Sequence, residues 1–521
     1  MSRSTFISQS NRIMKQLKEL TKIVTRKKLM RLSIIGQSTD SKLDQLYELI
    51  VDQKVSSDDE AAQILYQKTA SFSPYQKVKS KLKARLAEMT LLIDVNQPIN
   101  GNANLAYREA WHLWSIANQL MSRSARTATE EYAKKALKLA LDYEHIDLVV
   151  KISKFLRKNA ATYLGDENLF DHYNEMYHNY LQASLAEAKV EECYEKVMIL
   201  LVREKSNNKA IAELGEQLYV ELEPLLNKFD QLSIHRFIRY IQVTYLLNSF
   251  AYQETIEASQ KALDFFETKK FNLQNTIIGF LIHQLICYTQ LKKYKLGRES
   301  FNKCLVFLGD KKNSTFFKVN ELGLILFLHN TKYQEAYKLC LDTLNTKSLR
   351  QEVGYCQEAW RINGAYIHYL IYIGKVTPLE DDKTFTTFRL GKFLNEVPVF
   401  SKDKRGMNIP ILIIQFLFTI VMGKYDQAFD RIEAIERYVS RYIKKDEHYR
   451  SNCFIKMLLI IPKQGFHKLA VIRHTEKLRK KLSEVPLEIA NQIYEVEMIP
   501  YEDLWQMALD SLGLKHIKLK R

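Results

Sequence analysis

A cadence built around tyrosine recurs along this chain. In each instance an apolar helical run is followed by a short polar turn, a tyrosine and a second apolar run. The tyrosines are Tyr252, Tyr294, Tyr333 and Tyr425. Successive gaps are 42, 39 and 92 residues, and the last is close to two further units. A period of about 40 residues predicts stacked helical hairpins, because a single hairpin cannot bury its own apolar face.

Glycine and proline are scarce, which excludes most β-rich folds. The chain has 16 Gly and 9 Pro among 521 residues, against usual frequencies of about 7% and 5%. Little turn material is left for a many-stranded sheet. We therefore predict an all-α protein, a right-handed superhelical α-solenoid of stacked antiparallel hairpins with a small basic helical N-terminal domain.

Shifts in composition suggest the domain organisation. We expect a basic helical domain over 1–95, a linker over 96–104, helical hairpins over 105–230, repeats over 231–450 and capping helices over 451–521. The N-terminus lacks the apolar core of a signal peptide. The longest apolar run, Ile409 to Met422, is shorter than the roughly 20 residues of a membrane helix. We expect a cytoplasmic protein without a transmembrane segment.

The segment 285–305 carries the most complete instance of the cadence. Residues Leu285–Tyr288 close the first helix, Tyr294 marks the turn, Gly297 permits a close helix crossing, and Phe301 and Cys304 follow on the second helix. This pattern resembles a degenerate tetratricopeptide repeat, and the resemblance extends over about 230–450. It implies paired helices that stack into a solenoid.

A hairpin stack is mainly a surface for partners, so we expect a non-enzymatic scaffold or adaptor that binds a protein or peptide. Four polar residues interrupt the apolar first helices and are candidate contacts in a partner-binding groove: Asn248, Gln284, Asn320 and Asn363. Hydrogen bonding between helices is their alternative role.

Sequence motifs for catalysis or cofactor binding were sought without success. The chain has no phosphate-binding glycine loop, no H-E-x-x-H and no G-x-S-x-G. The six cysteines show no metal spacing and predict buried free thiols in a reducing compartment. We therefore expect no catalytic residue, no cofactor and no metal.

A carboxylate precedes a histidine by three residues at three places, a spacing found in di-iron helical bundles. The pairs are Glu109/His112, Asp142/His145 and Glu175/His178. His145 is predicted to begin a helix, whereas the other two histidines lie in mid-helix. We expect ordinary polar-face histidines rather than a shared metal site.

Positive charge is concentrated at the N-terminus. The whole chain has 77 basic and 60 acidic residues, a net charge of +17, and residues 1–35 hold nine basic residues and one acidic residue. The candidate basic patch comprises Lys15, Lys18, Lys22, Arg26, Lys77, Lys81 and Arg85, with Lys79 and Lys83 as further candidates. Such a field attracts nucleic acid, anionic lipid or an acidic protein.

The alternative function is therefore a nucleic-acid-associated regulator. In it, a helix-turn-helix within residues 57–95 contacts phosphate, and the solenoid acts as a sensor or partner-binding module. Its first helix would open with a capping box from Ser57 to Glu60, and its second would begin at Pro74. A solvated basic face on an N-terminal cap is the simpler interpretation.

Overall fold

The computed structural model describes residues 17–18, 20–21, 41–90, 102–203, 208–352, 354–386, 391, 393, 408–425, 449–489 and 497–512. These residues form helices and connecting turns without a β-strand element, which confirms the all-α class for this part of the chain. Contacts divide the chain into two compact units, Met1–Asn174 and Glu175–Arg521. The division falls within one long helix, α9, where our sequence boundaries placed no break.

Three helices near the N-terminus share an apolar core, to which Leu17 also contributes. They are α3 (Lys42–Val51), α4 (Asp58–Tyr66) and α5 (Ser73–Thr90). The Ser57 hydroxyl accepts a hydrogen bond from the Glu60 N–H at 3.3 Å, as the predicted capping box requires. The Glu60 carboxylate, however, accepts from the N–H of Ser56 at 2.6 Å, one residue before the predicted donor.

The rest of the first unit is a helical layer. It comprises α6 (Ala103–Ser122), α7 (Arg126–Asp142), α8 (Ile146–Asn159) and a π-helical turn, Ala160–Leu164, before α9 (Glu167–Arg203). The buried residues of α6 are all alanines, which lets α7 pack closely against it. Helix α7 begins at Arg126, and its N-cap residue, Ala125, has no side-chain acceptor for the free N–H groups of the first turn.

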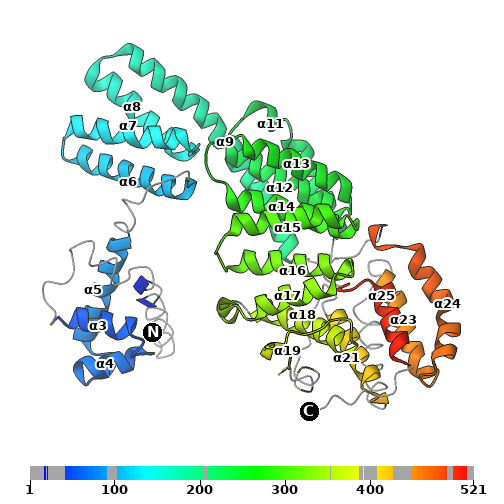
Figure 1. Ribbon diagram of the computed structural model, residues 1–521. Helices are drawn as coiled ribbons and strands as arrows, with labels where there is room; N and C mark the ends of the chain where they lie inside the picture. Colours follow the sequence, from blue (N-terminus) through cyan, green and yellow to red (C-terminus); the bar gives the residue numbers. More distant parts are fainter. Residues whose placement is uncertain are drawn as a thin grey trace. The chain divides into compact units, whose positions relative to one another are not determined.

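The second unit is built from helical pairs. They are the end of α9 with α10 (Asn208–Leu222), α12 (Leu232–Asn248) with α13 (Tyr252–Glu267), α14 (Gln274–Gln290) with α15 (Tyr294–Leu308), and α16 (Ser314–His329) with α17 (Tyr333–Leu344). Short helices α11 (Leu225–Lys228) and Lys347–Gln351 connect pairs, and α18 (Gly354–Tyr372) follows. The first helices α12, α14, α16 and α18 also contact one another in series (Figure 1).

One turn geometry explains the tyrosine cadence. In three pairs a residue with positive φ lies two positions after the end of the first helix, namely Phe250, Lys292 or Thr331. The N–H of the next residue bonds the carbonyl five positions earlier, as from Lys293 to Tyr288 at 2.9 Å. Tyrosine then opens the second helix, at Tyr252, Tyr294 and Tyr333. Tyr425 follows an equivalent turn, in which the Lys424 N–H bonds the Thr419 carbonyl at 2.9 Å.

Hydrogen bonds at both ends of the helical pairs connect residues about one repeat apart. At the turn within each pair, Lys293 Nζ donates to Gln253 Oε1 at 3.0 Å and Gln334 Nε2 donates to the Thr377 carbonyl at 2.9 Å. At the opposite end, the segment that follows a pair bonds back to the start of the same pair. These bonds are Lys269 Nζ to Asp230 O, Lys311 Nζ to Gln274 Oε1 and Ser348 Oγ to Lys312 O. The bonded residues are 36 to 43 positions apart, close to the period of the cadence.

The C-terminal helices pack among themselves and against the earlier ones. After the short α19 (Lys383–Thr386) come α21 (Asn408–Val421), α23 (Tyr449–Lys463), α24 (Lys468–Glu484), a 3-10 turn at Leu487–Ile489 and α25 (Tyr501–Ser511). The apolar α21 is buried between α18 and α25. A search of the described helices for one with the length and hydropathy of a membrane span found none. All six cysteines are free thiols, and five of them are buried as predicted, whereas Cys356 is half-buried.

Candidate interaction surfaces

The four predicted groove residues do not form an open surface. Gln284 is 4% exposed, and Asn320 and Asn363 are each 2% exposed. Gln284 donates to Gln260 of α13 at 3.0 Å, and Asn320 donates to Thr343 of α17 at 3.1 Å. Asn248 donates to the carbonyl of Thr244 in its own helix at 2.8 Å. The bonds of Gln284 and Asn320 therefore join two helices, which is the alternative role considered for these residues.

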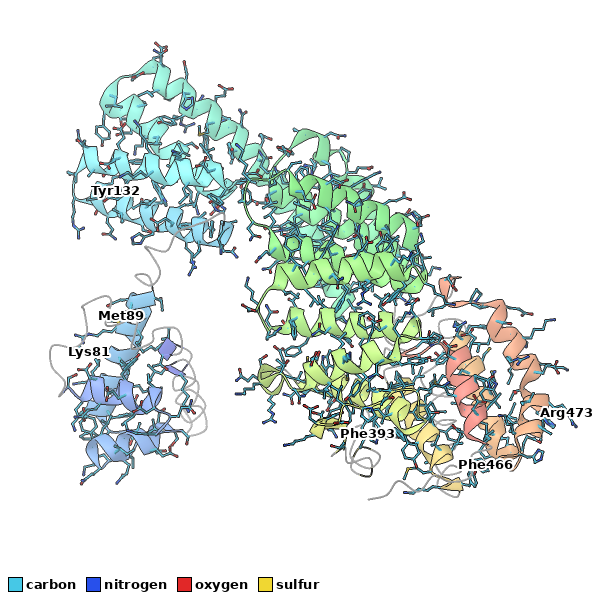
Figure 2. The ribbon with its side chains drawn as sticks, viewed as in Figure 1. Lys81, Met89, Tyr132, Phe393, Phe466 and Arg473 are labelled. Carbon is cyan, nitrogen blue, oxygen red and sulfur yellow. The ribbon has the colours of Figure 1, made fainter. Side chains whose placement is uncertain are left out.

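The structure describes four of the seven residues of the predicted basic patch, and three of these four are exposed. Lys15, Lys22 and Arg26 lie outside the described residues. Lys18 donates to the Ser56 carbonyl at 2.9 Å, just before α4. Lys77, Lys81 and Arg85 are exposed on α5, and their spacing of four residues places them along one ridge. Figure 2 labels Lys81 on this helix.

Lys79 is not a surface residue, so the prediction that it contacts phosphate is wrong. Its side chain is buried and forms an ion pair with Asp58 at 2.6 Å. The Tyr75 hydroxyl donates to the other oxygen of Asp58 at 2.7 Å. Burial, and then the bond to Asp58, raise the pKa of Tyr75 well above its usual value, so the phenol remains a donor. Lys83 is half-buried.

An aromatic surface that the sequence analysis missed lies on α6 and α8. Tyr107, Trp111 and Trp114 follow one another at helical spacing, and Phe155 faces them from α8. We call these four residues the aromatic face. Tyr107 is 38% exposed, and the other three are half-buried. The ring centroids of Trp114 and Phe155 are 5.5 Å apart, and those of Tyr107 and Trp111 are 6.3 Å apart.

Polar groups border the aromatic face. Lys151 Nζ lies 4.4 Å from the centroid of the Trp111 ring, a cation–π contact. The Tyr107 hydroxyl donates to Asp147 at 3.2 Å. The indole N–H groups of Trp111 and Trp114 meet no acceptor within the described residues. The face therefore combines exposed apolar area with two indole N–H groups that donate to no described residue.

The carboxylate–histidine pairs do not converge. Among the described residues, no group of three or more His, Cys, Asp or Glu side chains comes close enough to hold a metal ion. His145 precedes α8 as its N-cap residue, and its ring packs 4.8 Å from the Tyr107 ring centroid. Burial lowers the pKa of His145, so the imidazole beside the aromatic face is neutral at pH 7.

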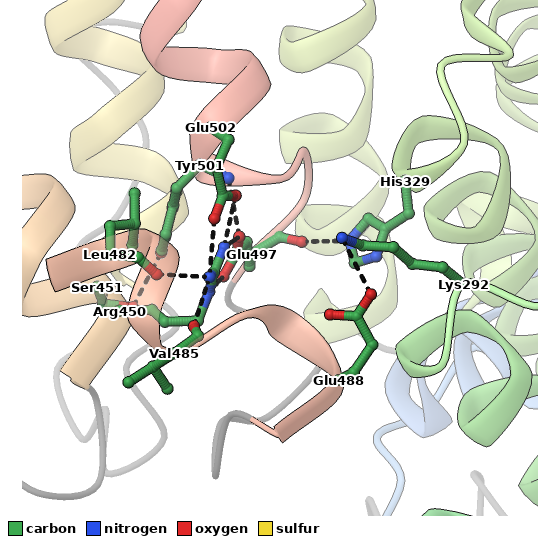
Figure 3. Close-up of polar contacts among 10 residues, drawn as sticks. All are labelled: Lys292, His329, Arg450, Ser451, Leu482, Val485, Glu488, Glu497, Tyr501 and Glu502. Carbon is green, nitrogen blue, oxygen red and sulfur yellow. Dashed lines mark hydrogen bonds and ion pairs between the residues drawn. The ribbon is translucent and has the colours of Figure 1, made fainter. Parts of the chain in front are cut away.

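A buried charged cluster joins the C-terminal helices (Figure 3). Arg450 on α23 is 1% exposed and lies between Glu497 and Glu502. Its guanidinium bonds Glu497 at 2.7 and 3.0 Å, Glu502 at 2.7 and 2.9 Å and the Val485 carbonyl at 2.7 Å. These bonds use all five N–H donors of the arginine. No donor remains for a ligand, so the cluster has a structural role.

The same cluster attaches the C-terminal segment to the helical pairs. His329, the last residue of α16, contacts the Glu497 carbonyl through Nε2 at 2.6 Å, and Lys292 pairs with Glu488 at 3.2 Å. Burial lowers the pKa of His329 to about 4, so its ring is neutral and Nε2 donates to the carbonyl. These contacts fix α25 with Leu504, Trp505 and Ala508 buried.

Comparison with known proteins adds no assignment. The chain matches no protein-family model, no curated protein and no solved structure. Any function must therefore be argued from the surfaces described above.

Proposed function

We propose that this chain is an α-solenoid scaffold that binds a protein partner through the aromatic face of α6 and α8. The observation that carries the proposal is the pair of half-buried tryptophans, Trp111 and Trp114, whose indole N–H groups meet no acceptor within the described residues.

The contacts within the second unit support the solenoid part of the proposal. Hydrogen bonds between residues 36 to 43 positions apart recur along the pairs, and those of Lys293 with Gln253 and Gln334 with Thr377 connect one pair with the next part of the chain. First helices contact the next first helices, as α12 does α14. In a solenoid each repeat contacts mainly its neighbours, and that is the pattern these contacts follow. The tetratricopeptide-like, right-handed arrangement is part of the same proposal.

The chemistry of the aromatic face supports a protein partner. Tryptophan and tyrosine dominate binding energy at protein interfaces, where their rings lose contact with water and their polar atoms find partners. The other two tryptophans of this chain, Trp360 and Trp505, are 1% and 3% exposed. A partner with an apolar side chain for the rings and a backbone carbonyl for the indole donors would complete the face.

The proposal is tested by affinity purification of the full chain from its native cells. Replacing both tryptophans, Trp111→Ala and Trp114→Ala, should reduce recovery of the partner by more than about tenfold, because each hot-spot truncation costs about 2 kcal/mol or more. The control is Tyr163→Ala, which removes a ring that is 58% exposed and lies outside the face. Partners recovered equally by both variants would contradict the proposal, provided that circular dichroism shows the variants to be folded.

A second candidate function, nucleic-acid binding through the N-terminal helices, is favoured by one observation. Lys77, Lys81 and Arg85 are exposed along one ridge and have no ion-pair partner within the described residues. A ridge of this kind matches a phosphate backbone. This function predicts that replacing all three residues by Gln weakens binding to duplex nucleic acid and reduces the dependence of that binding on salt.

A further inference from the structure

Helix α24 carries a concentrated positive charge. Between Lys468 and Glu484 the helix has six lysines and arginines and only two glutamates. Arg473, Lys477, Lys480 and Lys481 are all exposed. Positions four, seven and eight residues after the first lie on the same side of a helix. We call these four residues the α24 ridge.

No ion pair neutralises the α24 ridge within the described residues, although Glu476 and Glu484 lie three or four positions from its members. Lys468, before the ridge, pairs with Asp510 at 3.3 Å. Within the described residues, the side chains of the four ridge residues form no ion pair or hydrogen bond, and the Ser483 hydroxyl bonds only the backbone carbonyl of Lys480, at 2.8 Å. Figure 2 shows Arg473 extending from the side of α24 that faces away from α23 and α25. The ridge is therefore free to contact an anionic partner.

The apolar side of α24 is already in use. Val471, Thr475 and Leu482 are its buried residues, and the helix packs against α23 and α25. A helix that binds a membrane surface places its apolar side among the lipid chains. In α24 most of that side belongs to the protein core. Its exposed large apolar residues are Leu469 and Ile472, at 66% and 38%, so a partner meets mainly the charged side.

The residue types on the α24 ridge distinguish between the remaining partners. Three of the four residues are lysines, and none is aromatic. Protein interfaces are depleted of lysine and enriched in aromatic residues, methionine and arginine. A row of basic side chains along one helix is instead the electrostatic footprint of a nucleic-acid-binding protein.

We propose that the α24 ridge binds the phosphate backbone of duplex nucleic acid without sequence preference. The ridge from Arg473 to Lys481 spans eight residues, or about 12 Å at 1.5 Å per residue. Over that length a duplex carries about seven phosphates on its two strands, at one per 1.7 Å of axis. Four extended basic side chains can therefore each meet a phosphate. This site is separate from the aromatic face and from α5.

The test is fluorescence anisotropy of the full chain with a labelled 25-base-pair DNA duplex of arbitrary sequence, at 50 to 200 mM NaCl. The variant replaces the α24 ridge by glutamine: Arg473→Gln, Lys477→Gln, Lys480→Gln and Lys481→Gln. Each lost phosphate contact should reduce the slope of log K against log salt by about 0.9. We expect the slope to fall by about three to four and affinity at 100 mM NaCl to fall by at least about a hundredfold.

The matched control removes four exposed lysines elsewhere, from α13, α15 and α17: Lys261→Gln, Lys295→Gln, Lys303→Gln and Lys338→Gln. The control variant loses the same number of positive charges as the ridge variant. If the α24 ridge is the binding site, the control should keep most of its affinity for the duplex. Equal losses in the two variants would overturn the proposal, because net charge alone would then explain binding. Absence of binding by the unaltered chain at 50 mM NaCl would also overturn it.

A second arm uses vesicles of phosphatidylcholine with phosphatidylserine. If the ridge variant loses vesicle binding but keeps duplex binding, the ridge is a lipid-binding surface and the proposal is wrong. Recovery of the protein partner should be unchanged in the ridge variant, so failure of this inference and failure of the proposed scaffold function are separate results.

Discussion

Asp58, Tyr75 and Lys79 form a small polar cluster in the centre of the N-terminal helices. The ion pair of 2.6 Å and the tyrosine hydrogen bond of 2.7 Å satisfy Asp58 in the absence of water. A buried ion pair gains little overall, because desolvation of both charges opposes their attraction. Loss of one partner is far more costly, since a charge is then buried alone.

Asp58→Asn should therefore destabilise α3, α4 and α5 by about 3 kcal/mol, because Lys79 loses its counter-charge. Amide hydrogen exchange in these helices should become about a hundredfold faster. The double variant Asp58→Leu, Lys79→Met should recover most of the protection, and Lys77→Met on the exposed ridge should change little. Unchanged exchange in Asp58→Asn would contradict the buried pair.

Two glycines control how closely α15 and α16 approach. A Cβ atom on Gly297 would lie 2.8 Å from Leu326 Cδ1, and one on Gly323 would overlap the ring of Phe301. Gly297 is the small residue that the repeat pattern places after Tyr294. Its function in the structure is the predicted one, to permit close packing between helices.

Gly323→Ala should lower the free energy of unfolding by about 1 to 3 kcal/mol, because the added methyl group forces α15 and α16 apart. The control is Gly354→Ala at the start of α18, where a Cβ atom meets no atom within 4 Å. Urea denaturation followed by circular dichroism measures both. Equal stability of the two variants would show that α15 and α16 are not in close contact.

The junction between α16 and the C-terminal segment should respond to acid. The pKa of His329 is lowered to about 4 in the folded protein, against about 6.5 in an unfolded chain. The unfolded state therefore binds a proton that the folded state does not, and stability falls as pH falls from about 6.5 to about 4. Burial opposes ionisation of nearby Glu502, but its bonds to Arg450 outweigh this and lower its pKa.

Between pH 7.5 and pH 4.5, the free energy of unfolding of His329→Gln should fall by about 2 to 3 kcal/mol less than that of the unaltered chain. Glutamine keeps a donor for the Glu497 carbonyl but binds no proton. Denaturation at the two pH values gives the difference. His474→Gln, at an exposed histidine of α24, serves as the control. A pH dependence that is the same in both variants would contradict the role of His329.

The local sequence pattern predicted the helices more accurately than it predicted the contacts between helices. Helix α9, for example, runs unbroken from Glu167 to Arg203 because its apolar spacing continues without a glycine or proline. The repeated turn was visible because tyrosine follows it in the sequence. Lys79 was misjudged because its basic neighbours hid its position, four residues after Tyr75 and three before Leu82, on the apolar side of α5.

The two surfaces that carry the proposals left weaker signals. Tyr107, Trp111 and Trp114 have the spacing of a core stripe, and only the three-dimensional packing of α6 shows that they are half exposed. The charged cluster of Arg450 could not be predicted, because Glu497 is 47 residues away and His329 contacts Glu497 across 168 residues. Long-range pairing of this kind leaves no periodic pattern in a single sequence.

At the scale of the whole molecule, the proposed scaffold separates its binding surfaces. The aromatic face belongs to the first compact unit and the α24 ridge to the second. A solenoid suits this arrangement, because each repeat contacts mainly its neighbours and its outward residues can vary without altering the core. The buried cluster at Arg450 would then stabilise the C-terminal end of the hairpin stack.

The most direct test of the scaffold function is site-specific photo-cross-linking in native cells. The photoreactive residue benzoylphenylalanine replaces Trp114 in the full chain, and a control chain carries it at Tyr163. Our account predicts a discrete heavier product at position 114 that protease destroys, that Trp111→Ala abolishes and that the control lacks. No product, a product at both positions, a link confined to the same chain, or a product removed by nuclease would contradict it.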